Sequence, residues 1–221
     1  MNNDEKKRPG CAEKGIRAVG RCIHKGNQIM GKDKLNERQE IKCRLQKKIE
    51  EYTEKMTVIA FTGEIKSRIL LKAASQLPES KRSRILAVTV NGCLRPRVEI
   101  ELAKREAVAF GMNHYIFDMD ELRNGQIRSN SSDRCGQCRR YLFKNIEKLC
   151  RPLKAEQVLW GVDFDDWKEE GIRQIAEEFH LCAPLATLGI SRRELAGLAQ
   201  EFSLPFYSES TPHKTCSAFK G

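Results

Sequence analysis

Long apolar runs are missing from this chain. Across its 221 residues, no apolar stretch approaches the roughly 20 residues that a membrane-spanning helix needs. The first ten residues, MNNDEKKRPG, are polar and charged, and they lack the apolar stretch of a secretory signal. We therefore expect a cytoplasmic protein with no membrane partner.

The chain also lacks the even, closely spaced cysteine pattern of a disulfide-stapled protein. Its nine cysteines are an odd number. In a reducing compartment such residues are better interpreted as buried thiols, metal ligands or catalytic groups than as disulfides. Internal repeats are absent as well, and the length suits one main α/β domain with an extension.

Aromatic residues are not interleaved with the basic residues of the N-terminal quarter. Residues 1–55 hold fifteen Lys or Arg against nine Asp or Glu, which supplies six of the ten excess positive charges. Nucleic-acid sites usually combine basic and aromatic side chains, so a solvated charged face is the favoured interpretation here. Binding of nucleic acid remains the alternative.

Within this quarter the apolar residues keep a helical spacing. They predict a long polar helix from about Asp33 to Lys55 with a narrow apolar stripe that packs on the domain or on a partner helix. The stripe consists of Leu35, Ile41, Leu45, Ile49, Tyr52 and Met56. We divide the chain into a basic extension, 1–55, partly disordered and partly helical, and a main domain, 56–221.

From Thr57 onward strand and helix patterns alternate. Strands are expected at 58–61, 84–90, 114–118 and 157–162, and helices at 65–74, 96–110 and 134–150. Ser191 and Glu194 have the spacing of a capping box and predict a last helix. Continuous apolar strands separated by helices indicate a Rossmann-like, doubly wound, mostly parallel sheet, which binds ligands beyond the carboxyl ends of its strands.

The first of these units has the form of a phosphate-binding loop. An apolar strand is followed by Gly63 and then by a helix, whose free N–H groups and partial positive charge favour an anion. Only one glycine is present, however, and Glu64 places a negative charge beside any phosphate. Whether this loop still binds a nucleotide is the main question that the sequence raises.

Motifs in the later part of the chain carry a resemblance to a known family. They are Asp133-Arg134-Cys135 with Cys138, Leu142 and Phe143; Gly161 with Asp165 and Asp166; Gly171, Arg173 and Glu177; Pro184-Leu185 with Gly189-Ile190 and Glu194; and Pro212 with Cys216. In order and spacing, residues 56–221 resemble the PP-loop ATPases (adenine nucleotide alpha-hydrolase-like), and within them the LarE-type sacrificial sulfur insertases of nickel-pincer cofactor biosynthesis.

The resemblance implies a specific reaction. In that family ATP, with magnesium, adenylates a substrate carboxylate and releases pyrophosphate, and a cysteine thiolate then attacks the activated acyl group. Cleavage of the cysteine's own C–S bond leaves sulfur on the product and dehydroalanine on the protein. Cys216 stands at the position of the reactive cysteine. A nucleotide-like small molecule is the implied substrate, and a homo-oligomer the implied assembly.

The same resemblance implies a set of ligand-binding residues. For the nucleotide these are Thr62, Gly63, Lys66, Ser67, Gly161, Asp165 and Asp166, and for a substrate phosphate Arg173 and Lys220. Paired aspartates after a strand have two interpretations, because they coordinate magnesium or cap the next helix.

This sequence departs from the family pattern at the loop itself. The family's S-G-G-x-D-S is replaced by the six residues Thr62 to Ser67, in which Lys66 stands at the acidic position. A lysine contacts phosphate as a point charge, whereas Glu64 obstructs the backbone approach that glycine permits. Cys182 stands where the family commonly has an arginine, and Lys220 replaces an arginine near the end.

Cysteine placement suggests a second hypothesis. Cys135 and Cys138 form a C-x-x-C at a helix start, and Cys182 and Cys216 are expected in loops near the same sheet edge. Four thiolates at one edge suit zinc or an iron-sulfur cluster. The favoured interpretation is that the first pair belongs to the structural pattern and that Cys182 is a small buried substitute.

Three functions follow from these observations. The first is an ATP-dependent sulfur transferase of the LarE type. The second is a catalytically degenerate relative that binds a nucleotide or a partner, and the third is a tRNA sulfurtransferase that uses the basic N-terminal helix. The sequence alone does not decide whether the protein is an enzyme.

Overall fold

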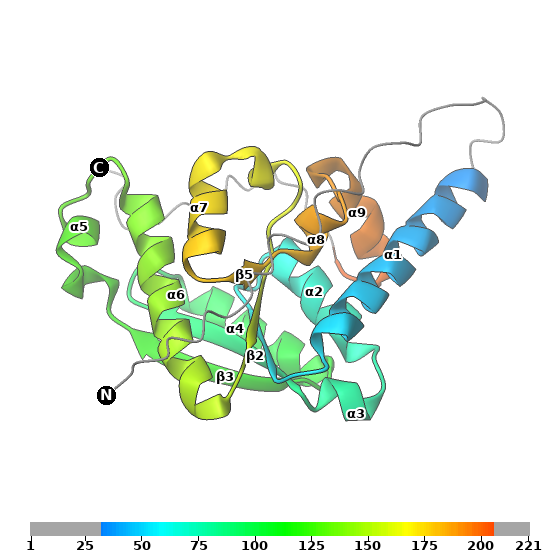
Figure 1. Ribbon diagram of the computed structural model, residues 1–221, viewed down its shortest axis with the longest axis horizontal. Coiled ribbons are helices and arrows are strands. Elements are labelled where there is room, and N and C mark those ends of the chain that lie inside the picture. Colours follow the sequence, from blue (N-terminus) through cyan, green and yellow to red (C-terminus); the bar gives the residue numbers. More distant parts are fainter. Residues whose placement is uncertain (1–31, 206–221) are drawn as a thin grey trace, which may run out of the picture.

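The computed structural model describes residues 32–205, with side chains from Asn36 onward. Its centre is a parallel sheet of five strands in the order β3-β2-β1-β4-β5 (Figure 1). The strands are β1 (Thr57–Ala60), β2 (Ile85–Gly92), β3 (Asn113–Met119), β4 (Gln157–Trp160) and β5 (Leu181–Cys182). The expected doubly wound α/β sheet is therefore confirmed, and β5 is a strand that the sequence pattern did not reveal.

Helices cover both faces of this sheet. On one face lie α1 (Lys32–Tyr52), α2 (Ile65–Ser75), α4 (Arg97–Ala109) and α9 (Arg192–Glu201), while α6 (Arg134–Leu153) and α7 (Glu170–Glu178) cover the other. The short helices are α3 (Glu79–Arg82), α5 (Gly125–Arg128) and α8 (Pro184–Thr187), with 3-10 turns at Glu121–Arg123 and Asp166–Lys168.

Strand β1 shows why these residues form a central strand. Its side chains alternate between the two faces, so Ile59 packs with α2 and α9 while Val58 and Ala60 pack with α6 and α7. All four residues of the strand are buried. A continuous apolar run is what a strand covered on both faces requires.

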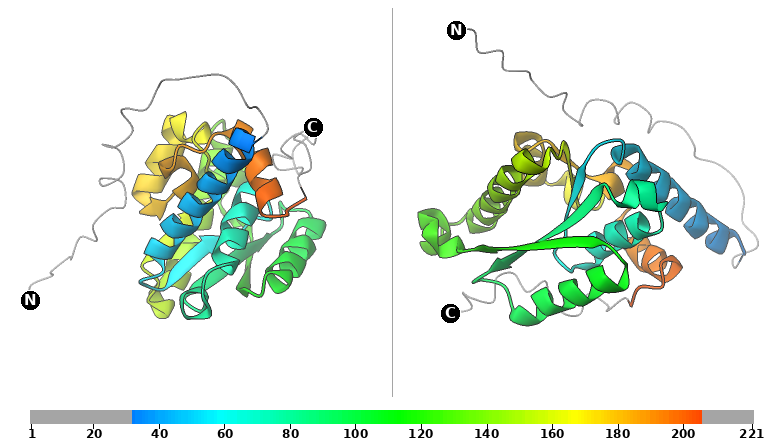
Figure 2. Two further views of the ribbon diagram at one scale, coloured as in Figure 1. Left: turned by 90° about the vertical axis from the view of Figure 1, so that its right-hand side faces the viewer. Right: turned by 90° about the horizontal axis from the view of Figure 1, so that it is seen from below.

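The long N-terminal helix α1 packs on the domain. Leu45 and Ile49 are fully buried in the same apolar cluster as residues of α2 and α9. The expected apolar stripe is therefore confirmed. Figure 2 shows α1 running along the face of the molecule that also carries α2 and α9. Two of its basic side chains are used in this packing, since Arg38 donates to Gln200 and Lys42 donates to the carbonyl of Glu201. Within the described residues, no helix is long and apolar enough to cross a membrane.

The strand order reverses between β1 and β4, and this fixes where polar groups gather. Strands β2 and β3 follow β1 in one direction through α2 and α4, whereas β4 and β5 extend the sheet in the other direction. The helices that follow β1 and β4 consequently lie on opposite faces of the sheet. In a sheet of this kind we expect a ligand crevice at the carboxyl ends of these two strands.

Candidate functional site at the β1–β4 switch point

The loop after β1 is closed by its own hydroxyl groups. Ser67 Oγ accepts a hydrogen bond from the Thr62 amide at 3.2 Å, lies 3.1 Å from Thr62 Oγ1 and donates to the Glu64 carbonyl at 2.9 Å. These contacts hold the turn against the first turn of α2. Thr62 and Ser67, both predicted nucleotide ligands, thus also shape the loop.

The loss of the second glycine leaves the loop backbone intact. Gly63 has a φ of +80°, in the left-handed region that favours glycine. Glu64 has φ −70° and ψ 156°, which is extended backbone that any residue adopts. The substitution therefore changes the charge, because the exposed Glu64 carboxylate lies at the amino end of α2 without capping it.

The loop after β4 approaches this turn very closely. A Cβ added to Gly161 would lie 2.8 Å from the Ser67 amide nitrogen and 3.2 Å from the Lys66 Cβ. Only glycine allows the two loops this separation without a shift of α2. Gly161 thus allows the loop after β4 to pack against α2, and its role in nucleotide binding stays a prediction.

An ion-pair cluster joins the two loops. The Lys66 ammonium, on the first turn of α2, contacts the Asp166 carboxylate and lies 3.5 Å from Asp163 Oδ2. Arg192, the first residue of α9, contacts Asp166 at 2.7 Å and approaches Asp163 at 3.8 Å. Lys66 and Asp166 were both predicted to belong to one site. The structure brings them together, although they are 100 positions apart in the sequence.

Asp163 is the most buried charged group of the cluster. Its side chain is 0% exposed, and its Oδ1 accepts a hydrogen bond from the Asp166 amide at 2.8 Å. Its Oδ2 has no hydrogen-bond partner among the described residues. A buried carboxylate in this state depends on nearby cations, which here are Lys66 and Arg192.

Sequence reasoning missed both Asp163 and Arg192. Asp163 lies between Gly161 and the Asp165–Asp166 pair, so its place inside a predicted motif was a signal that could have found it. Arg192 lies inside the predicted capping box, which the structure confirms around Ser191 and Glu194. A cation at the start of a helix is unfavourable by itself and was a second signal.

Asp165 does not cap the helical turn that follows it, which was one of the two interpretations that the sequence left open. Its Oδ2 accepts a hydrogen bond from the Arg192 amide at 2.9 Å, and its Oδ1 pairs with Lys168 at 2.7 Å. It therefore holds the first amide of α9, while Asp166 pairs with Lys66 and Arg192. Because both predicted magnesium ligands are engaged by cationic groups of the chain, the donor set does not fit a divalent cation in this arrangement.

Arg173 lies apart from the cluster. Its guanidinium donates to the carbonyls of Trp167 and Lys168 at 2.8 and 2.7 Å, so it holds the turn that follows the aspartates. The other residue predicted to bind a substrate phosphate, Lys220, and the predicted reactive Cys216 lie outside the described residues.

The predicted cysteine ligands are not brought together. Cys135 and Cys138 lie on the first turn of α6, whereas Cys182 is buried in β5, and not in a loop as expected, with its thiol 3.3 Å from Gln157 Oε1. Cys182 lies beside Cys150, because both line the same cavity. Cys150 is fifteen residues after Cys135 along α6, a distance of about 22 Å, so Cys182 is far from the first cysteine pair. Among the described residues, no group of three or more His, Cys, Asp or Glu is arranged to hold a metal.

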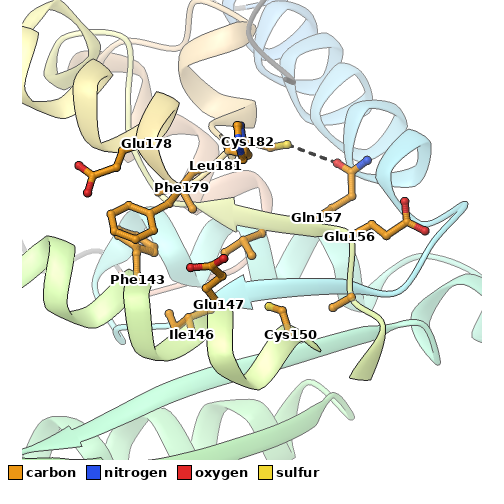
Figure 3. A pocket seen from close by; sticks show the side chains of 13 residues that line it. Phe143, Ile146, Glu147, Cys150, Glu156, Gln157, Glu178, Phe179, Leu181 and Cys182 are labelled. Carbon is orange, nitrogen blue, oxygen red and sulfur yellow. Dashed lines mark hydrogen bonds between the residues drawn. The ribbon is translucent and has the colours of Figure 1, made fainter. Parts of the chain in front are cut away.

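A cavity lies at the opposite end of the sheet. It has a volume of about 160 Å³ and is formed where α6 ends and β4 and β5 begin, beside Phe143, Cys150, Gln157 and Cys182 (Figure 3). We place the candidate site at the switch point instead, because there the helix terminus and the charged side chains converge.

Solved structures with the same arrangement identify the fold. The NMN synthetase of Francisella tularensis has a TM-score of 0.58 and 13% identity, covering 76% of this chain and 71% of that one. The U34-tRNA thiolase NcsA of Methanococcus maripaludis, solved with its 4Fe-4S cluster, has a TM-score of 0.61 and 15% identity, covering 91% and 76%. The chain has the PP-loop ATPase fold. At this identity the likeness establishes the fold alone.

Sequence comparison adds two uncharacterized relatives. A protein of Synechocystis sp. is 30% identical over 161 residues, which are 72% of this chain and 58% of the relative. A protein of Methanocaldococcus jannaschii is 24% identical over 169 residues, 76% of this chain and 61% of the relative. The chain thus spans about three-fifths of the length of these relatives. No family model matches it.

We expect Gly161→Ala to damage the site and Gly171→Ala to leave it intact. The first change puts a methyl group 2.8 Å from a backbone nitrogen, whereas an added Cβ at Gly171, in α7, meets nothing within 4 Å. Overpacking of this kind lowers the free energy of unfolding by about 1–3 kcal/mol, and a glycine-to-alanine change inside a helix is neutral or stabilising. Urea denaturation measures both, and equal stability of the two variants would contradict the close approach.

The pKa of Asp166 gives a second prediction. Burial alone would raise it, but the hydrogen bonds and charges of Lys66 and Arg192 outweigh burial and hold the pKa below its usual value. The resulting stabilisation is fully present above the unfolded pKa of about 3.9 and is lost as the pH falls through the lower folded pKa. We expect the stability difference between wild type and Asp166→Asn to be largest above about pH 5 and to shrink toward pH 3.

Denaturation midpoints across this pH range measure that difference. Glu177→Gln, at an exposed position of α7, is the control and is expected to follow the wild type. A gap between wild type and Asp166→Asn that stays constant down to pH 3 would show that the pairs do not stabilise the ionised carboxylate.

Proposed function

We propose that this protein binds ATP at the β1–β4 switch point and uses it as a sulfur transferase of the LarE type. The observation that supports this is the position of the Lys66 ammonium, on the first turn of α2 and directly beside the loop after β1. The helix terminus and the ammonium together attract an anion to this crevice. Structural relatives include an NMN synthetase and a tRNA thiolase.

In the proposed reaction the crevice holds the phosphates while a substrate carboxylate attacks the α-phosphorus. Pyrophosphate leaves and an acyl adenylate remains. The thiolate of Cys216 then attacks the acyl carbon, AMP leaves, and a thioester joins substrate and protein. A base removes the Cα proton of Cys216, the Cβ–S bond breaks, and the product departs as a thiocarboxylate while residue 216 becomes dehydroalanine.

An iron-sulfur cluster is a separate possibility for the sulfur source, and the described cysteines bear on it. Cys135 and Cys138 lie within one helical turn and are suited to share a metal ion, but Cys182 faces Gln157 at the other end of α6. A cluster on this chain would therefore use the first pair with residues other than Cys182. We assign the sulfur to Cys216 and derive no step through a cluster.

One observation favours the degenerate relative as the second candidate. In the described structure Lys66 and Arg192 are both paired with carboxylates, and Glu64 adds a further negative charge at the end of α2. A nucleotide must displace or share these pairs. A chain that has lost the activity would retain the fold and the internal ion pairs without binding ATP.

The affinity for ATP distinguishes the two candidates. Calorimetry with wild type is expected to give a dissociation constant between about 1 μM and 1 mM, the usual range for enzyme substrates. Arg192→Gln should weaken binding about tenfold to a hundredfold, as for the loss of one hydrogen bond to a charged group. Arg193→Gln, at the next position of α9 and exposed, is the matched control. Absence of measurable binding by wild type would favour the degenerate relative.

Mass spectrometry of the intact chain tests the sulfur chemistry. After incubation with ATP and a carboxylated nucleotide, we expect residue 216 to lose the elements of hydrogen sulfide. Cys216→Ala should show no change in mass, whereas Cys43→Ala, at an exposed position of α1, should react like wild type. An unchanged wild-type mass with ATP bound would remove the sacrificial reaction and leave the nucleotide site standing.

A further inference from the structure

The carboxylates beside the crevice are already neutralised by side chains of this chain. Asp163 and Asp166 both face the Lys66 ammonium, and Arg192 approaches the same two carboxylates from α9. Asp163 is 0% exposed, and its Oδ2, which has no hydrogen-bond partner among the described residues, is turned toward these two cations. An ammonium ion surrounded by carboxylates in this way occupies the position that a bound cation would take.

Nucleotide sites usually place a divalent cation between protein carboxylates and phosphate oxygens, because the two sets of negative charges otherwise repel each other. Magnesium does this with one or two carboxylates at about 2.0–2.1 Å. In this chain the distance from Lys66 Nζ to Asp163 Oδ2 is 3.5 Å, which suits an ion pair with an ammonium group. The same balance of charge is achieved without a metal.

Lys66 has the donors that this role requires. An ammonium group carries three N–H donors, and the described contacts of Lys66 are to Asp166 and Asp163. At least one donor is therefore left for a phosphate oxygen. The side chain arises from the first turn of α2, where the helix terminus also favours an anion.

We propose that Lys66 replaces the divalent cation of this site, so that the protein binds the phosphates of an adenine nucleotide without magnesium. The inference rests on the proposed function, since it concerns the same crevice. The Lys66 ammonium bridges Asp163 and Asp166 to the phosphates, and Arg192 supplies the second positive charge.

The affinity of wild type with and without magnesium tests this directly. Calorimetry with α,β-methylene-ATP, which cannot be cleaved at the α-phosphorus, is performed once in excess EDTA and once with excess Mg²⁺. We expect the two dissociation constants to agree within about threefold, because the Lys66 ammonium already neutralises the carboxylates. A threefold ratio corresponds to less than about 1 kcal/mol of binding free energy. Binding that is seen with Mg²⁺ but not in EDTA would overturn the inference and leave the proposed function intact. Absence of binding in both conditions would overturn both.

A charge-removing variant gives the reciprocal result. Lys66→Met keeps much of the side-chain volume, and it should lower affinity in EDTA by about tenfold or more, the loss expected for one charge-assisted hydrogen bond. Magnesium should restore part of this loss, because Asp163 and Asp166 then keep only Arg192 as a cationic partner in the cluster and have room for a divalent ion. Lys72→Met, in the last turn of the same helix, is the control and should bind like wild type in both conditions.

Equal binding by Lys66→Met and wild type in EDTA would contradict the role of the ammonium. Circular dichroism establishes that the variant is folded. If Lys66→Met does not fold, the wild-type comparison of EDTA with Mg²⁺ still decides the inference.

Discussion

The negative charge of Asp163 has to be balanced inside the protein, and the arrangement around the switch point follows from this. A fully buried carboxylate is costly unless cations and donors surround it. Here the Asp166 amide binds one oxygen, while Lys66 and Arg192 approach the other. These partners come from α2, from the turn after β4 and from α9, so one charge ties together three segments that are distant in the sequence.

The close contact at Gly161 makes this arrangement sterically feasible. It lets the end of β4 lie against the first turn of α2, and so brings Asp163 within reach of Lys66. Asp165 then fixes α9 by accepting from the Arg192 amide. The result is a helix terminus on one side of the switch point and paired charges on the other. Such an arrangement suits a polyphosphate, provided that the carboxylates remain neutralised.

Much of the fold was predictable from the sequence, because apolar periodicity reports burial directly. The strand expected at 58–61 is found as β1 at Thr57–Ala60, and the predicted capping box of α9 is confirmed. Strand β5 was missed because it is only two residues long, too short for any periodicity. Cys182 was consequently expected in a loop, although it is buried in that strand.

The candidate site was predictable only in part. The loop motif pointed to Lys66, and the aspartate pair pointed to Asp165 and Asp166, but no local pattern shows that a side chain on α9 reaches the loop after β4. Arg192 acts across 26 positions of sequence, and the burial of Asp163 depends on the packing of both loops. Glu64 had suggested that the phosphate loop was altered. Its backbone is extended, so the residue changes the charge of the loop and leaves the loop geometry intact.

A crystal structure of the protein with α,β-methylene-ATP would test the central claim most directly, namely that the crevice around Lys66 is the phosphate site. We predict that the phosphate oxygens lie within hydrogen-bond distance of the Lys66 ammonium and the Arg192 guanidinium, over the first turn of α2. A nucleotide bound elsewhere, with Lys66 and Arg192 still paired only to Asp163 and Asp166, would contradict it.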